Sequence, residues 1–482
     1  MTTSLPLNDL HLRDPNHSGQ SLQTQLYQAL SQRILDGRLQ PGDRLPSSRL
    51  LATDLGVARN TVLAVFDQLQ AEGFIRHQPR SGTFVDPRLP AQSVDGTPKP
   101  AAHPRPPLPS PALPWLQGSQ RREPNEQNRP FTPGLPDHQA FPLASWNRLL
   151  HQQESRTALL GYDSHQGYPP LRRAIADYLR QARGVRCHPD QIIITAGAQQ
   201  ALSMIAELFL HAGDTVLIED PGYRGARFAL ARPGVELQPV PLADTVLDLD
   251  QLPQQTDAKL LYCTPTHQYP LGGILDISQR LRLLDWAARA GVWIIEDDYD
   301  SEFHFTNKPL AAMQGLIEDA PVLYVGSFSK TLFPALRLGY LVVPPDLIDA
   351  FNQLKRIHTG ESPLLLQAVT AAFIDQGHFA RHLRRMRQHY HGKWQLLSEQ
   401  IEQRLDGQFR IVAESAGMHL VLERQGDDRA WAQQLSQAGY GPLALSDYAL
   451  AEPKRTGLVI GFANSSEEEI RDGVALLATL NA

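Results

Sequence analysis

The chain has 482 residues, of which 42% are hydrophobic and 20% are charged, and its formal net charge is −6. This length exceeds what one hydrophobic core organises, so we expect two or three domains. The acidic balance excludes bulk affinity for nucleic acid, and no apolar run approaches the roughly 20 residues of a membrane-spanning helix. With two cysteines, Cys187 and Cys263, and no recognisable export signal, we predict a cytoplasmic protein without membrane segments.

Three helical patterns follow a tail over residues 1–20 and open a first predicted domain over residues 21–86. Leucine and isoleucine side chains repeat every four residues along the first helix: Leu22, Leu26, Leu30 and Ile34. The second helix has Ser47 as its N-cap and stops at Gly56. The third begins near Arg59, and its apolar face consists of Val62, Val65, Phe66 and Leu69.

A hairpin follows the third helix, because "GFIRHQPRSGTFV" reads as two short strands around a turn at residues 78–81. Three helices and a hairpin are typical of a winged helix-turn-helix, whose recognition helix enters the major groove with its first residues. The alternative is an amphipathic domain with a solvated polar face, since residues 22–86 hold seven arginines against six acids. The candidate DNA contacts lie at the starts of two helices and at the wing: Ser47, Arg49, Arg59, Asn60, Thr61, Arg80 and Gly82.

Residues 87–129 are predicted to form a linker. Ten prolines lie between Pro87 and Pro114, a density that favours extended polyproline-II chain over helix or central strand. An ordered surface loop is the alternative, but loops of this length are rare inside compact domains. At roughly 3 Å per residue the segment reaches on the order of 100 Å, so it joins two bodies without fixing their contact.

Residues 130–482 show a different pattern, in which short β-branched runs alternate with helical stretches. The runs are "QIIIT", "TVLIED", "KLLYCT", "VWIIED" and "VLYVGS". Such alternation predicts a parallel sheet with crossover helices, an α/β fold. From about residue 350 helices dominate, which predicts a smaller α+β subdomain.

Polar side chains follow each of these runs, at the edge where open α/β sheets bind ligands. Ala198 and Gln199 open a helix after "QIIIT", where free N–H groups suit an anion. Tyr223 follows "TVLIED" on a tight turn. Asp297 and Tyr299, two residues apart, share one face of an extended chain after "VWII".

The last of these runs leads into "SFSKTLFPALRLGY", which contains Lys330. Together the strand ends offer an amine, a carboxylate, a phenol, a stacking ring and phosphate donors, which is what pyridoxal phosphate requires. A nucleotide-binding P-loop is the alternative for "GSFSKT", but a serine stands where the glycine before the lysine is needed. The ordered set along one sheet therefore favours pyridoxal phosphate.

The first domain resembles the winged-helix domain of GntR-type bacterial regulators over its whole length, through "GRLQPGDRLPSSRLLATDLGVARNTV" and "RSGTFV". Residues 130–482 resemble a fold-type I aminotransferase domain. The pieces "FTPGLPDHQAFPLASW", "GYDSHQGYPPLRRAIADYLRQARGV", "TAGAQQAL", "EDPGY", "TPTHQYPLGG", "IIEDDYDSEF" and "SFSKTLFPALRLGY" match in order. The whole chain thus resembles the MocR/GabR subfamily of GntR-type regulators.

This resemblance implies a winged helix-turn-helix joined to the fold of pyridoxal phosphate-dependent transferases. It implies that Lys330 forms an aldimine with the cofactor, that Asp297 pairs with the pyridine nitrogen, that Tyr299 bonds the ring 3′-oxygen and that Tyr223 stacks on the ring. The residues implied to hold the phosphate are Ala198, Gln199, Ser327, Ser329 and Arg337. Tyr162 resembles the tyrosine that reaches into the neighbouring subunit's site, which implies a homodimer, here expected to exchange its DNA-binding heads. No metal site is implied.

One position departs from the subfamily pattern. The family often has an arginine that clamps the substrate carboxylate, but "LVIGFANSS" puts Val459 there. We therefore predict a nucleoid-associated regulator that binds operator DNA and senses pyridoxal phosphate or an amine or amino acid at Lys330, controlling vitamin B6 or amine metabolism genes. The alternatives are an active aminotransferase with a DNA-binding head and a regulator whose C-terminal domain is only a dimerisation scaffold.

Overall fold

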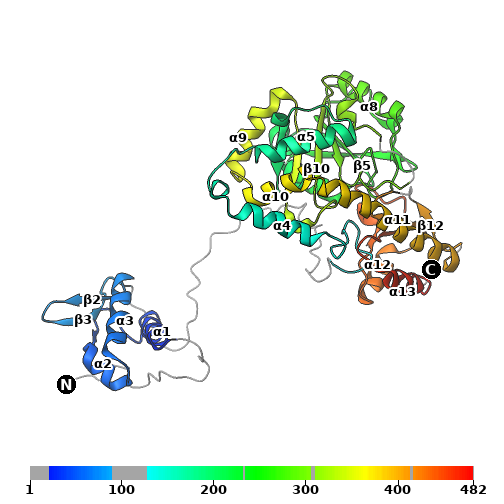
Figure 1. The fold of residues 1–482 in the computed structure, drawn as a ribbon. Helices are drawn as coiled ribbons and strands as arrows, with labels where there is room; N and C mark the ends of the chain where they lie inside the picture. The colour runs from blue at the N-terminus through cyan, green and yellow to red at the C-terminus, as the bar shows by residue number, and fades with distance from the viewer. Residues whose placement is uncertain are drawn as a thin grey trace. The chain divides into compact units, whose positions relative to one another are not determined.

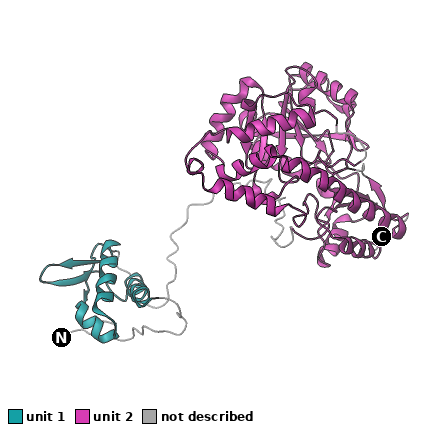
Figure 2. Cartoon of the chain, viewed as in Figure 1, with its two compact units in different colours: residues 1–108 teal, residues 109–482 magenta. Residues whose placement is uncertain are grey.

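The structure, a computed structural model, describes six stretches of the chain: residues 21–89, 128–231, 234–305, 310–405, 407–412 and 416–480. The chain divides into two compact units, residues 1–108 and 109–482, which Figure 2 colours separately. The predicted tail and residues 90–127 of the predicted linker lie outside the described residues.

The first unit has the predicted three helices and hairpin. Its helices are α1 (Leu22–Leu35), α2 (Ser48–Leu55) and α3 (Arg59–Ala71). Its strands are β1 (Arg44–Leu45), β2 (Ile75–Gln78) and β3 (Gly82–Val85), in the order β1-β3-β2, and Figure 1 shows the β2–β3 hairpin extending from the helices. The sequence does not predict β1, because its two residues lie between turns and become a strand only by pairing with β3.

The predicted apolar faces of these helices form the core of the first unit. Leu26 and Leu30 of α1 and Val62 and Val65 of α3 are completely buried and pack in one cluster. The Ser47 side chain accepts a hydrogen bond from the Leu50 backbone N–H and so caps α2, as predicted. The fold of the first unit therefore follows directly from periodicity and capping.

The second unit is built on an eight-stranded sheet in the order β4-β11-β10-β9-β8-β5-β6-β7. The strands are β4 (Ile192–Thr195), β5 (Thr215–Asp220), β6 (Glu236–Ala243), β7 (Val246–Leu247), β8 (Leu260–Cys263), β9 (Trp293–Asp298), β10 (Val322–Ser327) and β11 (Gly339–Val342). The sequence predicts a parallel sheet with crossover helices. The neighbours among β5, β6, β8, β9 and β10 are parallel as predicted, whereas β7 and β11 are antiparallel to their neighbours. Only residues 328–338 connect β10 to β11, too few for a helical crossover, so the chain turns back.

Helices cover both faces of this sheet. They are α4 (Leu143–Glu154), α5 (Pro169–Arg183), α6 (Ala198–Phe209), α7 (Arg224–Leu230), α8 (Ile277–Ala290), α9 (Ile348–His358) and α10 (Leu364–Asp375). Successive strand residues face opposite sides: Ile193 packs in a cluster with α6 and α7, whereas Ile192 and Ile194 pack in one with α5 and α10. In Figure 1, α5 and α10 lie over the strands.

The predicted smaller subdomain follows. Its elements are α11 (His378–Arg404), β12 (Arg410–Val412), β13 (His419–Glu423), α12 (Asp428–Gln437), β14 (Leu443–Ala444), β15 (Gly457–Gly461) and α13 (Glu467–Leu477). The strands form an antiparallel sheet in the order β12-β13-β15-β14. Within the described stretches, no helix is both long and apolar enough to cross a bilayer.

Candidate functional site

A cavity of about 160 Å³ lies where the strands of the large sheet end. It is lined by Gly197, Ala198, Gln199, Tyr223, Tyr262, Thr264, Tyr269, Asp297, Tyr299, Ser327, Ser329, Lys330 and Arg337. The residues come from the ends of β4, β5, β8, β9 and β10, as expected for an open α/β sheet. Every residue predicted to bind the cofactor is present except Tyr162, while Tyr262, Thr264 and Tyr269 were not predicted.

One end of the cavity is an anion cradle at the start of α6. Gly197 precedes this helix with φ 105° and provides no capping side chain, so the first N–H groups of α6 face the cavity side of the helix end. The guanidinium of Arg337 lies 4.0 Å from where a Cβ on Gly197 would stand. Arg337 itself adopts a left-handed φ of 51°, a conformation that costs a non-glycine residue on the order of 1 kcal/mol. A strained arginine beside a helix N-terminus is suited to hold a phosphate.

Two serines complete the cradle. The backbone N–H of Ser329 donates to Ser327 Oγ at 3.1 Å, and Ser327 Oγ donates to Ser329 Oγ at 3.1 Å. This local turn at the end of β10 fixes both hydroxyls on the cavity wall and directs the chain to Lys330.

Lys330 is held by a main-chain contact that the sequence did not predict. Its Nζ donates to the carbonyl of Gly134 at 2.6 Å. Gly134 has φ 78°, a conformation that favours glycine, and a Cβ there would come 2.5 Å from Nζ and displace the lysine tip. Removal from water lowers the pKa of Lys330, although Asp300 and Asp297 act to raise it. A lowered pKa leaves more of the amine neutral and nucleophilic.

Asp297 offers one carboxylate oxygen that the protein leaves unpaired. Its Oδ2 accepts a hydrogen bond from the Tyr262 hydroxyl at 2.8 Å, whereas its Oδ1 is buried and has no partner within the described residues. Burial raises the pKa of Asp297 to about 7; the Tyr262 bond lowers it and the neighbouring Asp298 raises it further. A buried acceptor without a donor fits the protonated ring nitrogen of pyridoxal phosphate.

Tyr299 lies on the cavity wall, but its hydroxyl is 2.8 Å from His267 Nδ1. The same ring nitrogen is 3.1 Å from both carboxylate oxygens of Asp300. His267 and Asp300 were not assigned a role from sequence, although both lie in the quoted segments "TPTHQYPLGG" and "IIEDDYDSEF". The phenol expected at the 3′-oxygen thus belongs to a buried Tyr–His–Asp network.

Another part of the cavity lining, which we call the aromatic end, centres on Tyr269. The rings of Tyr223 and Tyr269 meet edge to face with centroids 5.8 Å apart, and the hydroxyls of Tyr269 and Tyr448 are 3.2 Å apart. Val459 is completely buried on β15 in an apolar cluster with Tyr448. Arg455 is engaged by Glu423 and by the carbonyl of Asp244. Lys330 and Arg337 are the cations among the described lining residues, so this end has no guanidinium for a carboxylate.

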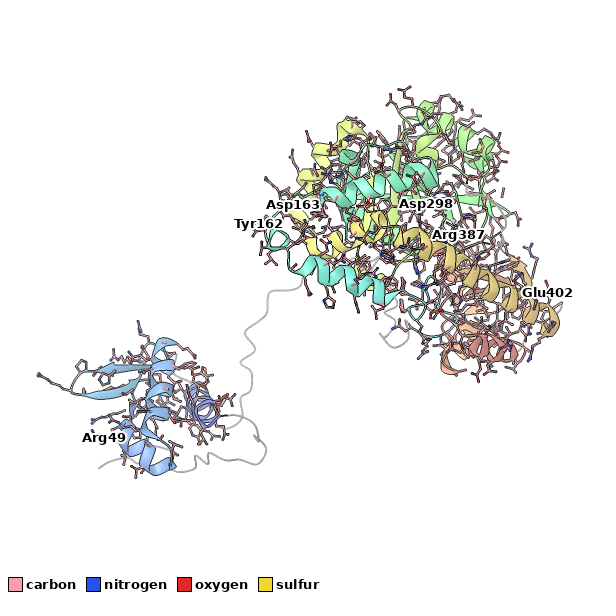
Figure 3. All side chains as sticks on the ribbon, viewed as in Figure 1. Arg49, Tyr162, Asp163, Asp298, Arg387 and Glu402 are labelled. Carbon is pink, nitrogen blue, oxygen red and sulfur yellow. The ribbon has the colours of Figure 1, made fainter. Side chains whose placement is uncertain are left out.

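Tyr162 does not line the cavity of its own chain. Its side chain is 95% exposed, just after a turn whose Leu160 is 81% exposed. Figure 3 shows Tyr162 beside Asp163 at the periphery of the second unit. Two large apolar side chains in water on one loop are consistent with a loop that another surface covers.

The predicted DNA contacts lie on the surface of the first unit. Arg49 on α2, labelled in Figure 3, and Arg59 and Asn60 on α3 are exposed, while Thr61 is half-buried. At the hairpin, Arg80 is exposed with φ 66°, and Gly82 opens β3. These arginines have no carboxylate partner among the described residues.

Arg44 is a further cation at this surface that the sequence did not single out. Its Nε lies 3.0 Å from where a Cβ on Gly82 would stand, so the guanidinium rests against the hairpin. It is exposed and belongs to β1, the strand that the sequence did not predict.

Comparison with known proteins gives two family matches. The family of aminotransferases of class I and II matches residues 134–475, and the gntR family of bacterial regulatory proteins matches residues 22–85. The probable rhizopine catabolism regulatory protein MocR of Rhizobium meliloti is 39% identical over 456 residues, covering 93% of this chain and 92% of the relative. The pyridoxine biosynthesis regulator PdxR of Corynebacterium glutamicum is 31% identical over 466 residues, covering 96% and 97%.

Among solved structures, the second unit resembles LysN, the alpha-aminoadipate aminotransferase of Thermus thermophilus. The TM-score is 0.67 with 27% identity, and the match covers 76% of this chain and 92% of LysN. LysN was solved in complex with N-(5′-phosphopyridoxyl)-L-leucine. The fold of the second unit is therefore that of fold-type I aminotransferases.

Proposed function

Because this chain belongs to the MocR-type members of the GntR family, transcriptional regulators that join a winged helix-turn-helix to an aminotransferase class I and II domain, we propose that it couples operator binding to the state of Lys330. The first unit binds operator DNA, as its family does. The second unit binds pyridoxal phosphate, the cofactor of its fold. The observation that carries the proposal is the cavity that unites the Lys330 amine, the unpaired Asp297 Oδ1 and the cradle at Arg337.

Each of these groups has one role towards the cofactor. Bound pyridoxal phosphate supplies an aldehyde that condenses with primary amines and a ring that withdraws electrons. Lys330, held near Gly134, provides the amine that attaches it. The Asp297 carboxylate would accept a hydrogen bond from the protonated ring nitrogen, and Tyr223 would lie against the ring. The α6 N-terminus, with Ala198 and Gln199, and the side chains of Ser327, Ser329 and Arg337 hold the phosphate.

The effector is pyridoxal phosphate itself or an amine or amino acid that competes with Lys330 for it. Competition frees the Lys330 ammonium beside Asp297 and Asp300, which changes the charge balance of a buried network. The names of the two relatives refer to rhizopine catabolism and to pyridoxine biosynthesis. Vitamin B6, amine or amino-acid metabolism genes are therefore the targets we propose for this chain.

The assembly we propose is a homodimer in the cytoplasm, associated with the nucleoid when bound to DNA. The exposed Tyr162 and Leu160 support it, because a second subunit would cover them and receive Tyr162 in its cavity. Residues 90–127 join the two units. A segment of this length would allow the DNA-binding unit of each chain to lie beside the second unit of the other chain.

Titration of the purified protein on the DNA upstream of its own gene tests the proposal. Binding is measured without ligand, with pyridoxal phosphate, and with a panel of primary amines. We expect Arg59→Ala to weaken DNA binding about tenfold or more under all conditions. Lys330→Ala should keep DNA binding and lose the response to ligand. A Lys330→Ala protein that responds like the wild type would overturn the coupling.

A catalytically active aminotransferase is the second candidate, supported by the retained Lys330 and Asp297. Steady-state assays with several amino donors and keto acids separate the two functions. The burial of Val459 where a clamping arginine is needed leads us to expect half-reactions without sustained turnover. Turnover at about 1 per second or faster would favour the enzyme.

A further inference from the structure

A second cavity, of about 260 Å³, lies between the start of α4 and the start of α11 in the second unit. It is lined by Pro142, Ser145, His378, Arg381, His382 and Arg385. None of these residues lines the Lys330 cavity. Both helices are labelled in Figure 1.

The walls of this second cavity are positively charged. Arg381 donates to the carbonyl of Gln376 at 3.1 Å and approaches His378 Nδ1 at 3.0 Å, and Arg385 donates to the carbonyl of Ala140. Arg148 of α4 lies 3.3 Å from His378 Nε2. None of the three guanidiniums has a carboxylate partner among the described residues. Loss of water, Arg381 and Arg148 all lower the pKa of His378.

The N-terminus of the long helix α11 adds to the positive potential of this second cavity. α11 has 27 residues and begins after Gly377, which provides no capping side chain. Its first N–H groups and the positive end of its dipole therefore face the region of Arg381 and His378. Such an end attracts anions, and here it coincides with unpaired guanidiniums.

His382 provides an independent sign of a ligand. It is 5% exposed, and its Nε2 donates to the carbonyl of Thr331 at 3.0 Å. Because a carbonyl only accepts, Nε2 carries the proton, and Nδ1 presents a lone pair that is buried without a partner. Burial lowers the pKa of His382 to about 4, so the ring stays neutral near pH 7. The lining of the second cavity is therefore complementary to a ligand with negatively charged oxygens and one O–H donor.

We propose that this second cavity binds a phosphate group, as free hydrogen phosphate or as a small phosphate monoester, with Arg381 and Arg385 on its oxygens and His382 Nδ1 accepting its proton. The second pKa of a phosphate monoester is about 6, so the monoprotonated form that supplies this O–H predominates below that pH and is a minority at about pH 7. Sulfate has a similar shape but carries no such proton. The ligand differs in place from the cofactor phosphate, which belongs to the cradle at Arg337.

The position of His382 links this site to the Lys330 cavity. Thr331, whose carbonyl receives His382 Nε2, directly follows Lys330. A group bound to Nδ1 polarises the same ring and so changes the bond to the Thr331 carbonyl. Occupation of the second cavity would therefore reach the backbone that carries the cofactor-binding lysine.

Isothermal titration of the full-length protein tests the site. The protein is first loaded with pyridoxal phosphate, which fills the cradle, and freed of excess. Inorganic phosphate, methyl phosphate and sulfate are then titrated separately at about pH 5.5, where both phosphates are mainly monoprotonated. We expect saturable binding of phosphate, about tenfold weaker in Arg381→Gln and in Arg385→Gln. Whichever of inorganic phosphate and methyl phosphate binds more tightly identifies the free ion or the ester as the natural form.

Arg384→Gln is the matched control, because Arg384 is an exposed arginine on the same helix and does not line the cavity. If Arg384→Gln loses as much phosphate affinity as the two cavity variants, the binding depends on general positive charge. The ligand would then be an adventitious ion only, and the proposed site would be refuted. His382→Leu removes the Nδ1 lone pair and puts no other acceptor in its place. We expect it to abolish the preference for phosphate over sulfate, with thermal unfolding confirming that the variant is folded.

The overturning results are equally concrete. Absence of saturable phosphate binding to the wild type, or equal affinity for phosphate and sulfate, would refute the site. If bound operator DNA excludes phosphate, the cavity is a contact for the DNA backbone and the proposal fails. None of these outcomes bears on whether Lys330 binds pyridoxal phosphate.

Discussion

The two ends of the Lys330 cavity differ in the ligand groups that they can bind. At the cofactor end, an unpaired Asp297 oxygen, an uncapped helix and Arg337 are the groups that we propose to hold pyridoxal phosphate. The aromatic end has Tyr269, whereas Val459, which stands where the family often has its clamping arginine, is completely buried and does not line the cavity. Holding the cofactor and clamping a substrate are therefore separable tasks. A chain that retains only the first is suited to recognition.

The largest expected effect comes from removing the cofactor link. Lys330→Ala should abolish the visible absorbance of protein loaded with pyridoxal phosphate and then gel-filtered, because no other lysine lines the described cavity. Lys259→Ala, at an exposed position, is the control and should keep the absorbance. Full absorbance in Lys330→Ala would mean that the cofactor end has been misassigned.

Val459→Arg tests whether the aromatic end lacks only one side chain. Val459 is completely buried with Leu271, Val421 and Tyr448, so an arginine there brings an unpaired charge into an apolar cluster. We expect the free energy of unfolding in urea to fall by about 3 to 5 kcal/mol. Val459→Ile, which adds a methylene but no charge, should cost about 1 to 3 kcal/mol. A stable Val459→Arg protein that binds amino-acid carboxylates would show that the two ends differ by a single substitution.

Most of the cofactor end could be predicted from sequence because Ala198, Asp297 and Lys330 lie at or soon after the carboxyl ends of β4, β9 and β10. Once the strands were recognised, the sheet edge brought Asp297, Tyr223 and Lys330 together without further information. The neighbour of Lys330 could not be predicted in the same way. Gly134 lies almost two hundred residues away, and only the tertiary fold places its carbonyl at Nζ.

The aromatic end could not be predicted from sequence either, because long-range packing brings its residues together. Tyr269 belongs to the large-sheet region and Tyr448 to the smaller subdomain, and their pairing depends on how the two pack. In the sheet, β11 is antiparallel because the connection after β10 is short, a constraint that strand patterns do not reveal. Short-range pattern thus predicts elements and strand ends, whereas direction and long-range contacts require the structure.

Asp297→Asn tests the cofactor end through the pH dependence of the free energy of unfolding. Without cofactor, burial raises the pKa of Asp297 to about 7, against about 3.9 when unfolded. The folded state then holds the proton more tightly, so the stability from this group is complete below the unfolded pKa and is lost as pH rises through about 7. The wild type should lose about 2 kcal/mol more than Asp297→Asn between about pH 5 and about pH 7 in urea unfolding.

The control for this measurement is Asp250→Asn, at an exposed carboxylate, which should follow the wild type. Addition of pyridoxal phosphate should reduce the wild-type loss, because its ring N–H pairs with the Asp297 carboxylate. Identical pH profiles for the wild type and Asp297→Asn without cofactor would contradict the unpaired buried oxygen on which the cofactor end depends.

The smallest expected effect belongs to the aromatic end. Tyr448→Phe removes one hydroxyl of the pair 3.2 Å apart with Tyr269 and leaves the main-chain bond from Gly222 N–H to the Tyr448 carbonyl intact. The absorbance of bound pyridoxal phosphate should not change. The concentration of amine needed to shift DNA binding should rise about fivefold, equivalent to about 1 kcal/mol. Tyr440→Phe, which loses a hydroxyl bonded to the Glu469 carbonyl elsewhere in the subdomain, should leave that concentration unchanged. If Tyr448→Phe instead released the cofactor, the two ends would be one cooperative site, and the separation of cofactor binding from ligand recognition would fail.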